Sequence, residues 1–174
     1  ENGTFDMIYH EHLCYYTINS LRNLLSKYGF KLFDAEYSEI HSGTIIAKFC
    51  KEECDKYPMT GRCIKQIVED EKYTLQSFVD LAQSIESKRD DLRSFLKELK
   101  DQGKTIYAYG APVKGNTLLN YMKIDGTIVD KVVEVNPLKV GKYTPGTHIP
   151  VIEESEDDLP DYYLLLSHNF KEAI

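Results

Sequence analysis

The sequence predicts an α/β protein whose C-terminal part folds as a doubly wound parallel sheet with flanking helices. Apolar runs of strand length alternate with a helical pattern from Lys104 onward, which is typical of a parallel sheet. Apolar residues at spacings of three and four between Cys63 and Gly103 predict a long helical region before that sheet. Two β-rich runs, 31–40 and 43–50, come earlier still and predict a hairpin or two adjacent strands.

The chain begins with a predicted strand end and a short helix. Residues 5–17, FDMIYHEHLCYYT, read as the end of an apolar strand that carries two histidines and a glutamate. From Asn19 the leucines of 21–25 share one helical face, and Gly29 follows as a predicted C-cap. The order predicted for this part is therefore strand, helix, strand, strand.

The long helical region is predicted to break near Tyr73 and to turn a charged face to solvent. Charged residues cluster at 86–91 on the face opposite the apolar positions, which is the usual pattern of a solvated helix. The segment 58–61 is the predicted linker, because Pro and Gly punctuate the chain there between a strand and the helical region.

The sheet region contains four predicted strands and one clear helix. The segment 105–111 reads as a buried strand, because its residues are mostly apolar or aromatic. The elements predicted after it are a helix at 114–123 and strands at 128–135, 148–152 and 162–167. The chain opens on Glu1 without Met and stops at 167–174 where a further helix begins, so both ends resemble cut ends.

Composition is that of a soluble globular protein and argues against two classes of partner. Hydrophobic residues make up 42% and charged residues 28% of the chain, and no apolar run approaches the roughly 18 residues of a membrane span. The net charge of -7 provides no basic surface for a phosphate backbone. We therefore expect neither a membrane nor a nucleic acid as a partner.

The cysteines predict reduced thiols in a cytoplasmic protein, because no signal peptide precedes them. Cys50, Cys54 and Cys63 are spaced like part of a zinc site. No Cys-x-x-Cys pair or closely spaced pair of histidines completes that site. We expect no bound metal.

The turn after the first sheet strand is the predicted anion site. The chain leaves that strand through Gly110 and Gly115 and enters a helix at about Asn116. Ligands bind at such turns because free backbone N–H groups and the helix dipole point at anions. Lys114 adds a positive charge for a phosphate. The stretch matches neither the GxGxxG fingerprint nor the P-loop, and plain turn glycines with a surface lysine remain the alternative.

Four further polar residues are candidates for the same crevice. Glu134 ends the second sheet strand, about where an acid of a nucleotide-binding half hydrogen-bonds ribose hydroxyls. Lys139, Lys142 and His148 follow in a loop rich in Gly and Pro, which is predicted to lie over the crevice. A strand-end charge and an ordinary loop are the alternative interpretations.

Three motifs, taken together and in this order, resemble the sugar-nucleotide C-methyltransferases. They are YHEH at 9–12, YGAPVKGNTLLNY at 109–121 and NPLKVGKYTPGTHIPV at 136–151. Members of that family use S-adenosylmethionine to methylate a ketosugar carbon in deoxysugar biosynthesis. The resemblance therefore implies a methyltransferase with a nucleotide-sugar substrate, and it covers nearly the whole chain.

The resemblance also implies a domain organisation. Residues 1–52 correspond to the C-terminal part of the methyltransferase catalytic domain, and residues 63–174 to a truncated Rossmann-like domain that binds the nucleotide sugar. The glycine-rich adenosylmethionine motif and the family's zinc cysteines fall outside this chain, so we expect the fragment alone to be inactive. Glu134 stands where the family has Asp, which lengthens the arm of the carboxylate by one methylene.

Within the YHEH motif, the resemblance assigns His12 as general base, Tyr9 as the hydroxyl near the enolate oxygen, and Glu11 as the carboxylate that orients the site. The reaction needs a base that titrates near neutral pH, and an unperturbed imidazole does so at about 6.5. A regular strand points Tyr9 and His12 to opposite sides. A bend is therefore required for the two side chains to converge.

Two other functions stay open. The first is a non-catalytic module that binds a nucleotide or a nucleotide sugar. The second is an NAD-dependent oxidoreductase, suggested by the strand, helix and strand of 104–136, although this stretch lacks GxGxxG.

Overall fold

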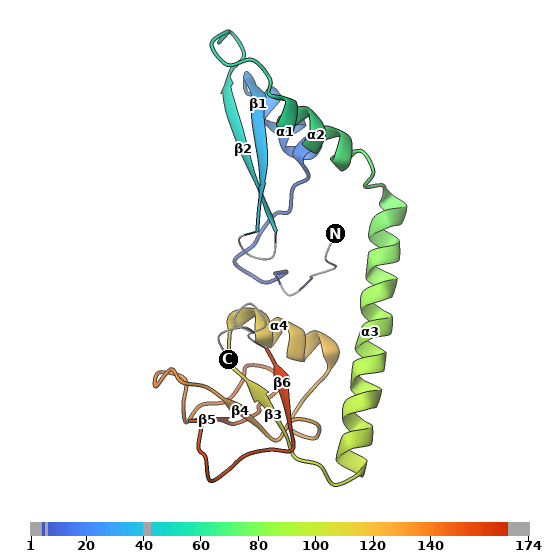
Figure 1. Ribbon diagram of the computed structural model, residues 1–174, viewed down its shortest axis with the longest axis vertical. Coiled ribbons are helices and arrows are strands. Elements are labelled where there is room, and N and C mark those ends of the chain that lie inside the picture. The colour runs from blue at the N-terminus through green and yellow to red at the C-terminus, as the bar shows by residue number, and fades with distance from the viewer. Residues whose placement is uncertain (1–4, 6, 40–42, 167–174) are drawn as a thin grey trace. The chain divides into compact units, whose positions relative to one another are not determined.

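The computed structural model describes residues 5, 7–39 and 43–166, and Figure 1 shows their helices and strands. The described residues form two compact units, the first within 13–82 and the second within 3–12 and 83–174. No described helix is both long enough and apolar enough to span a membrane.

Several sequence predictions are not tested by the structure. The turn predicted at 41–42 and the helix expected to begin within 167–174 lie outside the described residues. The domain limits 1–52 and 63–174 stay a prediction.

The strand end predicted at 5–17 is wrong, because the described residues of this segment form turns up to 11 and irregular backbone after it. The N–H of Ile8 donates to the carbonyl of Phe5, and that of His12 to the carbonyl of Tyr9, each at 2.9 Å. Local turns therefore satisfy these backbone groups, which a strand would have paired with a neighbouring strand.

The first unit contains two helices and a hairpin. Its elements are α1 (Ile18–Ser26), β1 (Phe30–Ser38), β2 (Thr44–Lys51) and α2 (Gly61–Asp70). The predicted hairpin is confirmed, since β1 and β2 pair antiparallel with one irregularity between Leu32 and Asp34. The predicted helix is also confirmed, although its C-cap is Lys27, and Gly29 follows with a φ of +73° that turns the chain into β1.

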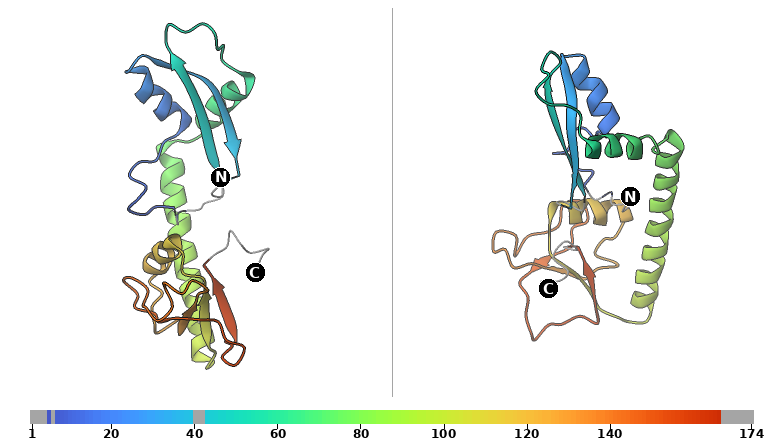
Figure 2. Two further views of the ribbon diagram at one scale, coloured as in Figure 1. Left: turned by 90° about the vertical axis from the view of Figure 1, so that its left-hand side faces the viewer. Right: turned by 45° about the horizontal axis from the view of Figure 1, so that its top comes forward.

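Both helices pack on one face of the hairpin, as Figure 2 shows. The buried side chains between them are Ile18, Leu32, Ala35, Cys63 and Ile67. Asp70 at the end of α2 accepts the N–H groups of Ile18 and Asn19 at 3.2 and 2.9 Å. The end of one helix thereby caps the start of the other.

Asp34 is buried and forms the centre of a charged cluster in the first unit. Arg62 donates to both of its oxygens, and Thr60 and Lys48 donate at 2.7 and 3.1 Å. Arg62 and Lys48 also pair with Glu36. The bonds from Arg62 and Thr60 hold the pKa of Asp34 far below its usual range, although desolvation opposes this shift.

Acid is therefore expected to destabilise the first unit through Asp34. Because the folded-state pKa is lowered, this contribution is complete above the unfolded value of about 3.9 and is lost as pH falls toward the folded value. The variant D34N should be less stable at pH 7 and should lose less stability on acidification, measured by urea unfolding from pH 7 to 2. D55N is the matched control. Asp55 is exposed, and its ion pair with Lys31 is long, at 3.6 Å. If the free energy of unfolding falls with pH equally in D34N and in the unmodified chain, the role given to Asp34 is contradicted.

The predicted break in the helical region is confirmed. The chain forms α3 (Leu75–Asp101) after a turn at 71–74 that includes Tyr73. The C-terminal half of α3 packs on the sheet of the second unit through Leu92, Leu96 and Leu99.

The predicted parallel sheet is confirmed, and its strand order among the described residues is β5-β4-β3-β6. Its elements are β3 (Ile106–Tyr109), α4 (Val113–Met122), β4 (Lys131–Val133), β5 (Val151–Ile152) and β6 (Tyr162–Leu165). Between these strands the described chain forms one helix, α4, and the other two connections are irregular. The fold is thus α/β with a Rossmann-like parallel sheet flanked by helices.

The two faces of the sheet differ. Ile106 and Ala108 of β3 point into the apolar core that α3 and α4 cover. Tyr107 and Tyr109 point to the other face, where their rings meet Tyr163. The acidic connection 153–161 crosses this second face, because Asp158 accepts from the Tyr107 hydroxyl at 2.6 Å and Glu154 from that of Tyr109 at 3.2 Å.

Candidate functional site

The turn between β3 and α4 has the features of an anion site. Gly110 takes a φ of +82°, which favours glycine and sends the chain from the strand toward the helix. Pro112 is the N-cap of α4 and offers no side-chain cap. The amide groups of a first helical turn have no partner within the helix and carry the positive end of its dipole. The turn therefore suits a negatively charged group.

Gly115 lies in the first turn of α4 and allows the helix to approach β6 closely. A Cβ built on Gly115 would meet the Cβ of Leu166 and the ring of Pro112, both at 3.1 Å. Its role is therefore helix-to-strand packing, which is one of the glycine functions in nucleotide-binding turns. Lys114 and Asn116 flank it on α4 and are both half-buried.

Replacing Gly115 by valine should destabilise the second unit by about 1–3 kcal/mol, because the added side chain pushes α4 away from Leu166. Urea unfolding followed by circular dichroism measures the loss. Gly126→Val is the matched control, since a Cβ at Gly126 meets no atom within 4 Å. Equal losses in the two variants would show that close approach is not the reason for Gly115.

Glu134 lies at the carboxyl end of β4, next to the turn. Its carboxylate accepts the N–H of Ala111 at 3.0 Å and the ammonium of Lys139 at 3.2 Å. Burial raises the pKa of Glu134, but the N–H groups of Asn136 and Ala111 and the Lys139 ammonium outweigh this and hold it below its usual value. The structure thus brings Glu134 and Lys139 together with the turn.

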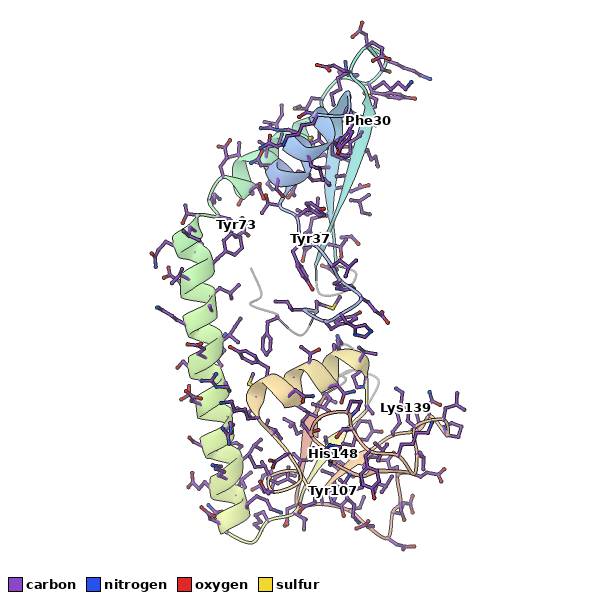
Figure 3. The ribbon with its side chains drawn as sticks, turned by 180° about the vertical axis from the view of Figure 1, so that it is seen from behind. Phe30, Tyr37, Tyr73, Tyr107, Lys139 and His148 are labelled. Atoms are coloured by element: carbon purple, nitrogen blue, oxygen red, sulfur yellow. The ribbon has the colours of Figure 1, made fainter. Side chains whose placement is uncertain are left out.

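Lys142 and His148 are placed elsewhere. Both are exposed, and Lys142 lies beside β5, where its carbonyl accepts the N–H of Val151. His148 precedes the amino end of β5, whereas Gly110 follows the carboxyl end of β3. In a parallel sheet these are opposite ends. Figure 3 shows His148 and Lys139 apart from one another.

The YHEH motif contains the bend that the sequence required. Residues 9–12 form a turn, closed by the bond between the His12 N–H and the Tyr9 carbonyl. The turn places the two rings 4.4 Å apart at an angle of 34°. His12 is half-buried, while His10 and Glu11 are exposed and 3.9 Å apart. Tyr9 and His12 therefore present a hydroxyl and an imidazole side by side.

Residues 5–12 belong to the same unit as the sheet. The ring of Phe5 packs on the edge of the sheet core and lies 4.9 Å from the ring of Tyr121 on α4. The guanidinium of Arg89 lies 5.8 Å from the Tyr121 ring. The candidate base and the candidate anion turn are thus parts of one compact unit.

Neither a metal centre nor an adenosylmethionine site can be assigned to the described residues. No group of three or more His, Cys, Asp or Glu side chains suited to a metal ion occurs among them, and all four cysteines are free. The first unit offers a hairpin and two helices, without a glycine-rich turn from a parallel strand into a helix.

Comparison with known proteins identifies relatives of the chain. Residues 39–174 match the family described as the C-methyltransferase C-terminal domain. The C-methyltransferase NovU of Streptomyces niveus is 28% identical over 179 residues, which cover 100% of this chain and 42% of that protein. The chain thus spans less than half the length of this relative.

Proposed function

The chain belongs to the C-methyltransferase family, and from this premise we propose that it is part of an enzyme that methylates a ketosugar carbon of a nucleotide-linked deoxysugar. The observation that carries the proposal is the turn at 9–12, which places the rings of Tyr9 and His12 side by side in the unit that also holds the anion turn. A base, a hydroxyl donor and a phosphate site are the three groups that such a substrate requires.

In the proposed reaction, His12 removes the proton from the carbon beside the ketone. The electrons of the broken C–H bond move to the carbonyl oxygen, where the Tyr9 hydroxyl stabilises the developing negative charge. Glu11 lies in the same turn and orients the site. The resulting enolate carbon is the nucleophile that would take the methyl group, while the bond between that group and the donor's sulfonium sulfur would break and leave its electrons on sulfur.

The nucleotide part of the substrate is proposed to bind at the start of α4. Its phosphates meet the amide groups of the first helical turn, next to Gly110, Gly115 and Asn116, and the charge of Lys114. Lys142 and His148 stay candidates only for parts of a substrate that reach beyond this end of the sheet.

The methyl donor is proposed to be S-adenosylmethionine, bound by parts of the whole protein outside this chain. The chain by itself then binds the nucleotide sugar without methylating it. This is the binding-module function that the sequence left open. The free cysteines are consistent with a cytoplasmic setting.

Methyl transfer by the whole protein tests the proposed function. The protein is incubated with S-adenosylmethionine and a series of dTDP-4-ketohexoses, and products are analysed by mass spectrometry. A product heavier by one methyl group is expected for at least one sugar. No such product from any of them would overturn the proposed function.

Binding measurements on the chain alone address its own role. Calorimetry is expected to detect binding of dTDP and to show no binding of NAD. Binding of NAD, followed by hydride transfer in the whole protein, would favour the oxidoreductase alternative instead.

A further inference from the structure

The carboxylate of Glu134 is fully occupied by groups of this chain. One oxygen accepts the N–H groups of Val135 and Asn136 at 3.0 and 3.1 Å. The other accepts the N–H of Ala111 at 3.0 Å and the ammonium of Lys139 at 3.2 Å. A carboxylate offers about four lone-pair sites, and these donors from the described residues fill them. A ribose hydroxyl would have to displace one of the four.

The same contacts fix the backbone of the anion turn. Ala111 donates its N–H to Glu134, and its carbonyl accepts the Lys139 ammonium at 2.8 Å. The preceding residue, Gly110, donates to the carbonyl of Val133 at 2.8 Å. Ala111 comes directly before Pro112, the N-cap of α4. The two side chains therefore determine the direction in which α4 and its amide groups begin.

The opposite charges of Glu134 and Lys139 also stabilise each other. The side chain of Glu134 is only 10% exposed, so its charge depends on internal donors. Lys139 divides its hydrogen bonds between that carboxylate and the Ala111 carbonyl. A phosphate that recruited Lys139 would leave Glu134 with one donor fewer in a mostly buried place, which is costly.

We infer that Glu134 and Lys139 are positioning residues, which hold the turn between β3 and α4 in the shape that receives the substrate's phosphates and do not themselves contact the substrate. This inference rests on the proposed function of the turn. It replaces the ribose contact that spacing along the sequence suggested for Glu134.

Binding of pyrophosphate, which has no ribose, separates the two roles. Calorimetry on the 174-residue chain compares pyrophosphate, dTDP and UDP as ligands of the unmodified chain and of E134Q. A positioning role predicts that E134Q weakens all three by the same factor, about five- to thirty-fold. A direct ribose contact predicts weaker binding of dTDP and UDP with unchanged binding of pyrophosphate, which would overturn the inference.

Glu154→Gln is the matched control, because Glu154 follows the carboxyl end of β5 and accepts from the Tyr109 hydroxyl rather than from the backbone of the turn. Loss of a negative charge alone should strengthen phosphate binding, whereas loss of positioning should weaken it. The two variants are therefore expected to change affinity in opposite directions. Tighter or unchanged binding by E134Q would overturn the inference. Thermal unfolding of each variant confirms that it is folded at the assay temperature.

A double-mutant cycle tests whether the two residues act as one unit. K139M should weaken pyrophosphate binding about as much as E134Q, and the double variant should be no weaker than either single variant. Additive losses would show independent contacts and would overturn the inference. In the whole protein, E134Q should raise KM for the nucleotide sugar by the same factor and leave kcat within about twofold.

The experiments distinguish this inference from the proposed function. If the unmodified chain binds neither pyrophosphate nor dTDP, the phosphate role of the turn fails and the positioning role fails with it. Methyl transfer by the whole protein is measured separately and decides the proposed function.

Discussion

Replacing His12 by alanine in the whole protein is expected to lower the rate of methyl transfer by about 10²- to 10⁴-fold while substrate binding is retained. The imidazole is half-buried against the Tyr9 ring, so its removal deletes the proposed base without opening an apolar core. Steady-state kinetics should show the loss in kcat, with KM nearly unchanged.

His10→Ala is the matched control, since His10 lies two residues away in the same turn and is exposed. It should leave turnover nearly unchanged. Exchange of the substrate's α-proton with deuterated water, measured without a methyl donor, isolates proton removal from the later step. His12→Ala should abolish this exchange and His10→Ala should not. Unchanged turnover of the His12 variant would remove His12 as the base.

Tyr9→Phe separates the hydroxyl from the ring. The phenylalanine ring can still contact His12, so the turn at 9–12 is expected to persist. Loss of one donor to a developing oxyanion typically lowers kcat by about 10²- to 10³-fold. A smaller effect than that of His12→Ala is therefore expected, and proton exchange should be slowed rather than abolished.

The regular elements could be predicted because their signals are local. The leucines of 21–25 and the spacing between 63 and 103 mark helical faces, and α1, α2 and α3 lie where these patterns place them. Composition does not distinguish a strand from turns at 5–17, because apolar and aromatic residues occur in both. The backbone hydrogen bonds of Ile8 and His12 distinguish turns from a strand, and composition does not reveal these bonds.

The site was predicted in part. The turn at Gly110 follows from the change of strand into helix, which is visible in the sequence. The partner of Glu134 is not visible, because Ala111 lies 23 residues away and meets it only when β3 and β4 pair. His148 was expected near the same crevice, but the loop before β5 must return to the amino end of the sheet. A Gly- and Pro-rich pattern shows that a loop exists and does not show where it leads.

Replacing Leu119 by alanine is expected to destabilise the second unit by about 2–5 kcal/mol. The side chain projects from α4 into the core and is 1% exposed. It packs in the same cluster as Ile106 of β3 and Leu96 of α3, so its removal leaves a cavity where helices and sheet meet. The cavity should also loosen α4 and weaken binding of dTDP.

Leu118→Ala is the matched control for this change, because Leu118 precedes Leu119 on the same helix but is only partly buried at the margin of the core. The loss of stability in the Leu118 variant should be less than half of that in the Leu119 variant. The chain has two compact units, so the second unit is followed by itself. Hydrogen exchange of the α4 amides, measured by mass spectrometry, reports the second unit directly. Exchange is expected to speed up more in the Leu119 variant than in the Leu118 variant. Equal effects of the two variants would mean that α4 does not pack on the sheet through Leu119. The geometry proposed for the phosphate-binding end of α4 would then lose its support.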